Sequence, residues 1–205
     1  MVRALSAALL LAATSASAAP LALPSFENAV SQLQATVKSL RAASVKALSA
    51  DIGPQLDSLS WDLQRSAQDA SRMRDDLRLL MTRVNTRAPG APADQTLTWD
   101  VQRFNQDLQT LAQDSQWRLN DLRSLSAQAQ KDPGLVARAQ NLDNAARALK
   151  SMTNWLVFDV RFDTMDLNRA GYTFESMDLD RYSRDVDQSA QDLQNEADRL
   201  LAKVR

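Results

Sequence analysis

Apolar residues between Pro54 and Arg87 recur in alternating steps of three and four. The series runs through Leu56, Leu59, Leu63, Ser66, Ala70, Met73, Leu77, Leu80 and Val84. This spacing places every member on one face of an α-helix and is typical of helices that pack at shallow angles. A β-strand cannot produce it, because strand side chains alternate between two faces. The pattern therefore predicts a long helix with a heptad seam.

A similar apolar series precedes this helix and meets it at Gly53-Pro54. Its members are Phe26, Val30, Leu33, Val37 and Leu40, followed after a shift of one residue by Val45, Leu48 and Ile52. Gly favours the end of a helix, and Pro suits the first turn of the next one. We therefore predict a tight reversal at Gly53-Pro54. A kinked continuous helix is the alternative, so residues 1–52 either pack as a separate helix or continue into the next.

Three further breaks divide the rest of the chain into helices. Residues 88–92, Ala-Pro-Gly-Ala-Pro, cannot continue a helix, and Asp94 can cap the next one. Asp132-Pro133-Gly134 is a second break, with Asp132 as a cap, and the third lies near Gly171. Apolar residues recur at helical spacing in each remaining segment: Leu97, Val101, Phe104, Leu108, Leu111, Leu122, Leu125 and Ala129; Leu135, Ala139, Leu142, Ala146, Leu149 and Leu156; Leu179, Tyr182, Val186, Leu193, Ala197, Leu200 and Val204. Residues 158–163 alternate like a strand, but a lone strand would have no partner, so we expect helix there too.

These segments predict an all-α fold, an elongated antiparallel bundle of four to five long helices with heptad-type seams. The composition agrees, since only four glycines occur and 44% of residues are hydrophobic. Neither β-branched runs nor Gly-rich turns are common enough to suggest sheets.

The first 18 residues have the three parts of a signal peptide. Arg3 supplies a positive charge, residues 4–13 are apolar, and Ala16-Ser17-Ala18 offers small residues for cleavage. We predict cleavage after Ala18, which leaves residues 19–205 as a single helical-bundle domain. The mature chain would be exported, periplasmic or extracellular, and no later stretch has the roughly 20 apolar residues of a transmembrane helix.

Histidine and cysteine are both absent from the chain. Their absence excludes a Ser-His-Asp triad, a cysteine nucleophile, disulfides, the usual zinc sites and c-type haem. A carboxylate pair or a Ser-Lys arrangement remains available in principle, but no motif indicates either. We therefore expect no enzyme activity, no cofactor and no metal site.

A short phrase recurs along the chain. Its copies are Trp61-Asp62-Leu63-Gln64-Arg65, Trp99-Asp100-Val101-Gln102-Arg103, Met165-Asp166-Leu167-Asn168-Arg169 and Met177-Asp178-Leu179-Asp180-Arg181. In each copy Asp and Arg are three residues apart, close enough to form an ion pair on a helix surface. A duplicated surface pair is the favoured interpretation, and a binding element repeated once per helix is the alternative.

The acidic residues offer no clear site. The formal net charge is −1, and Asp alternates with Arg, so we expect no nucleic-acid partner. Asp159, Asp163 and Asp166 share one helix face and could form a weak cation site. Arginines are interleaved with them, however, and we favour a solvated surface neutralised by arginine.

Aromatic residues gather in one late segment, which is the candidate interaction patch. It comprises Trp155, Phe158, Phe162, Tyr172, Phe174 and Tyr182. Trp155, Phe158 and Phe162 advance by three and then four residues, so they share one helix face. We favour burial of this segment, with an exposed patch for a partner or ligand as the alternative.

Three functions fit these observations. The leading hypothesis is an exported, non-catalytic interaction protein with a protein partner: a scaffold, adaptor or chaperone-like binder of the cell envelope. The first alternative is a carrier that holds an apolar ligand or lipid within the bundle. The second is a self-assembling coiled-coil structural protein, which would be a homo-oligomer.

Overall fold

The structure is a computed structural model that describes residues 23–87 and 94–205. The chain divides into two compact units, Met1–Ser44 and Val45–Arg205, and each is described by itself. The signal peptide predicted over residues 1–18 lies outside the described residues. In the first unit, the helical residues include Leu33, Val37 and Leu40, whose side chains are all exposed.

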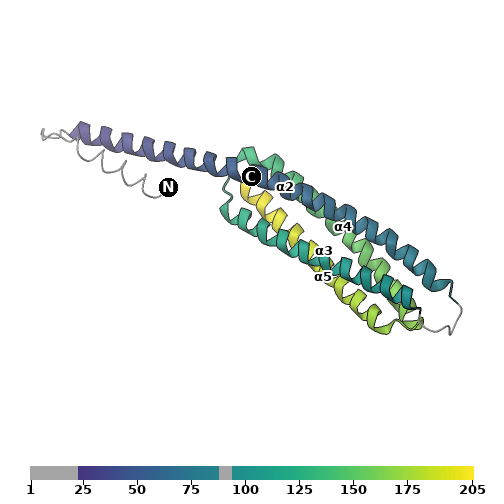
Figure 1. Ribbon diagram of the computed structural model, residues 1–205. Helices are drawn as coiled ribbons and strands as arrows, with labels where there is room; N and C mark the ends of the chain where they lie inside the picture. The colour runs from purple at the N-terminus through teal and green to yellow at the C-terminus, as the bar shows by residue number, and fades with distance from the viewer. Residues whose placement is uncertain (1–22, 88–93) are drawn as a thin grey trace. The chain divides into compact units, whose positions relative to one another are not determined.

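The described residues are almost entirely helical and contain no strand. The long helices are α2 (Leu23–Asn85), α3 (Gln95–Gln128), α4 (Val136–Arg169) and α5 (Thr173–Val204) (Figure 1). A single turn of 3-10 helix, η1 (Pro133–Leu135), precedes α4. The predicted all-α fold is confirmed, and residues 158–163 are helical as expected, within α4.

In the second unit, consecutive helices run antiparallel, and side-chain contacts identify the neighbours of each helix (Figure 1). The contacts are Arg83 with Asp100 between α2 and α3, Arg74 with Asp159 between α2 and α4, Lys150 with Asp187 between α4 and α5, and Gln116 with Ser189 between α3 and α5. Each helix therefore has one antiparallel and one parallel neighbour, because α2 and α4 run in one direction and α3 and α5 in the other.

The core of this bundle is aliphatic and follows the predicted seams. Every residue of the seam from Leu56 to Val84 is buried, as are all the predicted inward residues of α3 and α4. In α5 only Tyr182 departs from the prediction, since it is half-buried. Serine and threonine at seam positions donate to carbonyl oxygens of their own helix, as Ser115 Oγ does to Leu111 O at 2.8 Å. Helices can therefore approach closely there without leaving a hydroxyl unsatisfied.

The predicted reversal at Gly53-Pro54 is wrong, because α2 continues through both residues. Pro54 removes one backbone donor, but the helix on either side is unbroken. Gly53 is buried, and a Cβ atom built on it would lie 1.7 Å from Nη1 of Arg138 in α4. Glycine therefore leaves room at this position for the Arg138 side chain, and the continuous-helix alternative holds.

The other predicted breaks fall where helices end. Asp94 Oδ1 accepts from the Thr96 backbone N–H at 2.9 Å, and Asp132 Oδ1 accepts from that of Gly134 at 2.8 Å. Both aspartates are therefore caps, as predicted. Gly171 joins α4 to α5 with φ of +94°, a conformation that favours glycine. Residues 88–92, the remaining predicted break, lie outside the described residues.

Candidate functional site

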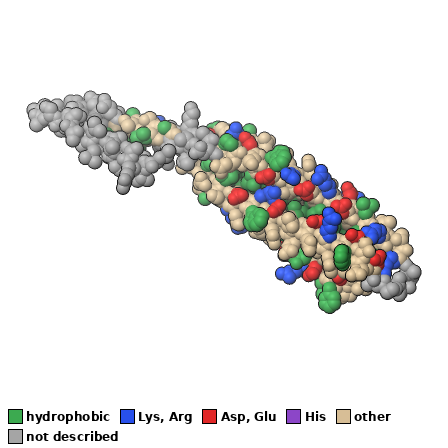
Figure 2. All heavy atoms as spheres, viewed as in Figure 1, with side chains coloured by type: hydrophobic (Ala, Val, Ile, Leu, Met, Phe, Trp, Pro, Cys, Tyr) green, Lys and Arg blue, Asp and Glu red, His purple; other side chains and the backbone are tan. Residues whose placement is uncertain are grey.

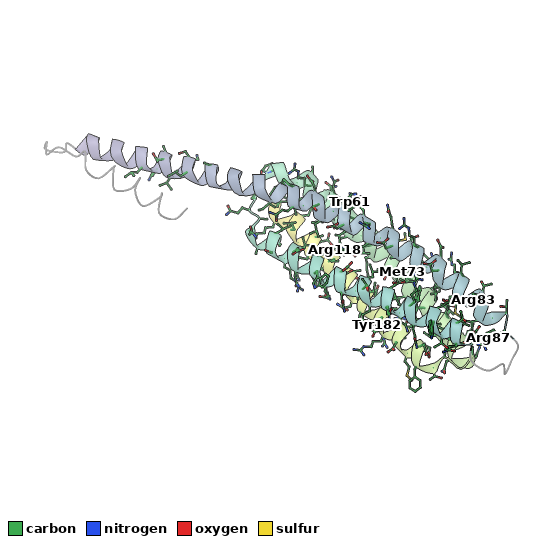
Figure 3. The ribbon with its side chains drawn as sticks, viewed as in Figure 1. Trp61, Met73, Arg83, Arg87, Arg118 and Tyr182 are labelled. Carbon is green, nitrogen blue, oxygen red and sulfur yellow. The ribbon has the colours of Figure 1, made fainter. Side chains whose placement is uncertain are left out.

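Most aromatic side chains of the bundle face outward. Trp61, Trp99, Trp117 and Trp155 are between 51% and 68% exposed. Among the described phenylalanines, Phe104 is buried, whereas Phe158, Phe162 and Phe174 are exposed. Figure 3 shows Trp61 on the outer side of α2. Tryptophan supplies large contact areas at protein interfaces, so this distribution favours a binding role for the outer surface of the bundle.

Four exposed residues form a continuous row on α4, which we call the α4 surface seam: Trp155, Phe158, Phe162 and Met165. The Trp155 and Phe158 rings meet edge to face with centroids 6.3 Å apart. The Phe158 and Phe162 rings are tilted, with centroids 4.8 Å apart. Both arrangements are favourable for aromatic pairs, so the three rings stabilise one another on the helix surface.

The favoured burial of this segment is wrong for Trp155, Phe158 and Phe162. The inward face of α4 is already occupied by aliphatic residues, including Leu156, Val157 and Val160. A helix at the corner of a bundle presents one stripe to the core, and residues on the opposite stripe remain in solvent. The predicted common face of the three aromatic residues is confirmed. Met165 extends the row and was missed, although its step of three from Phe162 follows the same spacing.

The α4 surface seam is tied to α2 through Arg74. Its guanidinium carbon lies 5.2 Å from the centroid of the Trp155 ring, a cation–π distance. Arg74 Nε also donates to Asp159 Oδ2 at 2.5 Å, and this hydrogen bond raises the pKa of Arg74 further. Both side chains of this ion pair are largely shielded from water, so salt screens it less than it screens an exposed pair. Trp155 is thereby linked to α2 by a single side chain, while about half of its surface remains exposed.

Asp163 occupies an inward position of α4, between Val160 and Leu167 in the helical series. Burial raises the pKa of its carboxyl group to about 6, and the charges of Asp159 and Asp166 add to the effect. Asp159 forms an ion pair with Arg74, and Oδ1 of Asp166 lies 3.3 Å from Nη1 of Arg169. In the part of the chain that the structure describes, no three acidic residues are placed to hold a metal ion.

Tyr172 differs from the other residues of the predicted patch, because its side chain is buried in the core. Its hydroxyl oxygen accepts a hydrogen bond from Arg87 and another, at 3.2 Å, from the backbone N–H of Asp94. Figure 3 shows Arg87 at this end of the bundle. Tyr172 thus connects the start of α5 to the residues that flank residues 88–93, and its role is structural.

Phe174 and Tyr182 line a groove between α3 and α5, away from the α4 surface seam. The groove has a volume of about 360 Å³ and is otherwise polar, lined by Gln102, Asn105, Gln106, Gln109, Glu175 and Asp178. Phe174 is 82% exposed, and Tyr182 is half-buried. The predicted patch is therefore three separate features: a row on α4, a buried tyrosine and two groove residues.

The recurring phrase occurs once in each of the four long helices. Its first residue is exposed in every copy, and its third is buried: Trp61 and Leu63, Trp99 and Val101, Met165 and Leu167, Met177 and Leu179. The expected ion pair within the copy forms only in the third copy, between Asp166 and Arg169, among these described residues. Elsewhere Asp100 pairs with Arg83 of α2, and Arg65 lies over the Trp61 ring. In every copy, an exposed apolar side chain is followed two residues later by a buried one.

The charged side chains of the bundle are mixed over its surface. Figure 2 shows acidic and basic groups interspersed with apolar side chains on the visible face, without a large region of one sign. Among the described helices, none combines the length and the apolar character that crossing a bilayer requires. The chain matches no family model, no curated protein and no solved structure.

Proposed function

We propose that this chain is an exported, non-catalytic interaction protein of the cell envelope, which binds protein partners through aromatic residues on the outside of its bundle. The observation that supports this most directly is the exposure of Trp61, Trp99, Trp117 and Trp155 over a core of aliphatic residues. Exposing an indole to water without a partner forgoes the stabilisation that its burial would provide. Binding surfaces are where such side chains are enriched.

Export is supported by the three-part pattern of residues 1–18. A non-catalytic role is supported by the absence of His and Cys from the sequence. An apolar carrier receives less support, because the groove between α3 and α5 is lined mainly by carboxamide and carboxylate groups. Such a lining favours polar over apolar ligands.

The binding role is tested by placing a photoreactive aromatic residue at Trp99, in cells that produce the protein. The matched control places the same residue at Gln113, which is also exposed on α3. We expect a discrete cross-linked product at position 99 and none at position 113. Absence of a product at position 99, or identical products at the two positions, would overturn the proposed function.

The export component has its own measurement. Intact mass of the protein recovered from the cell envelope or medium should correspond to a chain that begins at Ala19. A chain that keeps Met1 and remains inside the cell would contradict export. The cross-linking result would then still decide whether the surface binds a partner.

A further inference from the structure

Helix α4 carries two heptad series on opposite sides. The inward series includes Leu149, Thr153, Leu156 and Val160, which pack in the bundle. The outward series is the α4 surface seam, Trp155, Phe158, Phe162 and Met165, with steps of three, four and three. This is the spacing that lets a helix pack along its length against a second helix. Within the described part of the chain, all four side chains are more than half exposed, so no helix covers the row, although Arg74 of α2 contacts Trp155 at its end.

We propose that the missing helix is α4 of a second copy of this chain, and that the two α4 helices pair in parallel. The inference rests on the proposed function, since it assigns a partner to the same aromatic surface. The charges beside the seam are complementary to those of a second copy, and the area that the seam could bury determines how strong the pair is.

The charges that flank the seam are complementary in a parallel pair. In such a pair, the residue before the first core position of a heptad lies beside the partner residue five places later in sequence. With Phe162 as that core position, the two residues are Arg161 and Asp166. Arg161 is exposed and makes no ion pair within the described residues, and Asp166 has only an exposed pair with Arg169. The two-fold symmetry of a parallel pair forms the Arg161–Asp166 contact twice.

An antiparallel pair would not have this complementarity. That orientation brings equivalent flanking positions together, so Asp159 and Asp166 of one copy would lie beside the same two aspartates of the other. Like charges at adjacent positions are destabilising. Because Arg74 already neutralises Asp159, the preference for the parallel orientation rests on the Arg161–Asp166 contact, which an antiparallel pair would lose.

The exposed area sets the strength of the pair. Each seam side chain is roughly half exposed, and an aromatic side chain has about 150–250 Å² to bury. The four side chains then contribute on the order of 400 Å² per copy, or about 800 Å² in total, below the roughly 1,200 Å² of stable interfaces. The dimer is consequently reversible, and its population depends on protein concentration.

Sedimentation of the full chain over a wide range of concentrations tests self-association. We expect the mean mass to rise from one chain towards two as concentration increases. The double variant Phe158→Lys, Phe162→Lys should raise the dissociation constant about tenfold or more, because two charges replace the centre of the seam. The control Phe174→Lys changes a more exposed phenylalanine in α5 and should associate as the unmodified chain does. Circular dichroism should show that all three proteins are folded.

A mass of one chain at every concentration would overturn the proposal, and so would equal association of the double variant and the unmodified chain. Neither of these two sedimentation results would contradict the proposed function, which is tested by cross-linked products at position 99. Conversely, absence of those products together with a seam-dependent dimer would overturn binding of other proteins and retain self-association.

The parallel orientation has an independent test, because the chain has no cysteine. In a parallel pair, Met165 faces Met165 of the other copy, so Met165→Cys should form a disulfide-linked dimer on mild oxidation. Met177→Cys is the matched control, an exposed methionine at the same place in the recurring phrase on α5. We expect cross-linking at position 165 at least tenfold faster than at position 177. Equal rates would overturn the parallel pairing.

Discussion

Gly53 of α2 and Arg138 of α4 approach so closely that a methyl group on the glycine would overlap the guanidinium. The hypothetical Cβ atom lies 1.7 Å from Nη1 and 2.9 Å from Cζ of Arg138. Arg138 is held over the glycine by Asp57, whose Oδ2 lies 3.3 Å from its Nε. Glycine often ends a helix, but Gly53 lies within α2. Its lack of a side chain leaves room for Arg138 of α4, which forms an ion pair with Asp57 of α2.

Gly53→Ala should reveal this contact through its dependence on Arg138. Alanine is better than glycine within a helix by about 1 kcal/mol, but in the unmodified protein it must displace the Arg138 guanidinium. We expect Gly53→Ala to raise the free energy of unfolding by roughly 0.5–1 kcal/mol in an Arg138→Ala background. In the unmodified background the gain should be smaller or reversed. Chemical denaturation of the four proteins measures this, and equal effects in both backgrounds would show that the residues do not interact.

The pKa of Asp163 predicts how stability changes with pH. Its folded-state pKa is about 6, above the roughly 3.9 of an unfolded aspartate, so the folded protein binds more protons between these values. The contribution of Asp163 to stability should therefore fall as pH rises from about 4 to 6 and stay constant above that range.

Asp163→Asn should remove this contribution. We expect the variant to be more stable than the unmodified protein at pH 7.5, by on the order of 1 kcal/mol after allowance for partial solvent screening, and to lose that advantage near pH 4. Thermal or urea unfolding across this range is the measurement, with exposed Asp178→Asn as the control. A difference between Asp163→Asn and the unmodified protein that does not vary with pH would contradict the prediction.

Substitution of Tyr172, just before α5, should lower the free energy of unfolding more than substitution of Tyr182, within α5. Tyr172→Phe removes the hydroxyl that accepts from Arg87 and from the Asp94 backbone, within a buried environment. We expect it to lower the free energy of unfolding by about 1–2 kcal/mol. Tyr182→Phe, at a half-buried groove position, should change it by only a few tenths. Equal losses from both substitutions in denaturant titrations would be inconsistent with the placement of Tyr172.

Tryptophan fluorescence should report the outward placement of the indoles. All four are more than half exposed, so emission from the dilute folded protein should already resemble that of indole in water. Unfolding in guanidinium chloride should shift the emission maximum only slightly, and acrylamide should quench the folded and unfolded chains to similar extents. A strongly blue-shifted emission from the dilute folded protein would show that indoles are buried.

Much of the bundle could be predicted from local patterns. The seam from Leu56 to Val84 and the aspartate caps depend on residues within one or two helical turns of one another. The heptad spacing of Trp155, Phe158 and Phe162 was equally visible in the sequence. Whether that row faced the core could not be predicted, because α4 has apolar residues on more than one side.

The sequence by itself determined where helices form, which residues of each are inward-facing candidates, and which catalytic chemistry is excluded. Only the tertiary structure decided that Gly53 lies within a helix and that Asp163 is partly buried. It also decided that Tyr172 is in the core, whereas the α4 surface seam is exposed to solvent. Spacing along a helix is a local property of the chain. Burial depends on which distant segments pack against each face, and α4 can present only one of its two apolar sides to the core.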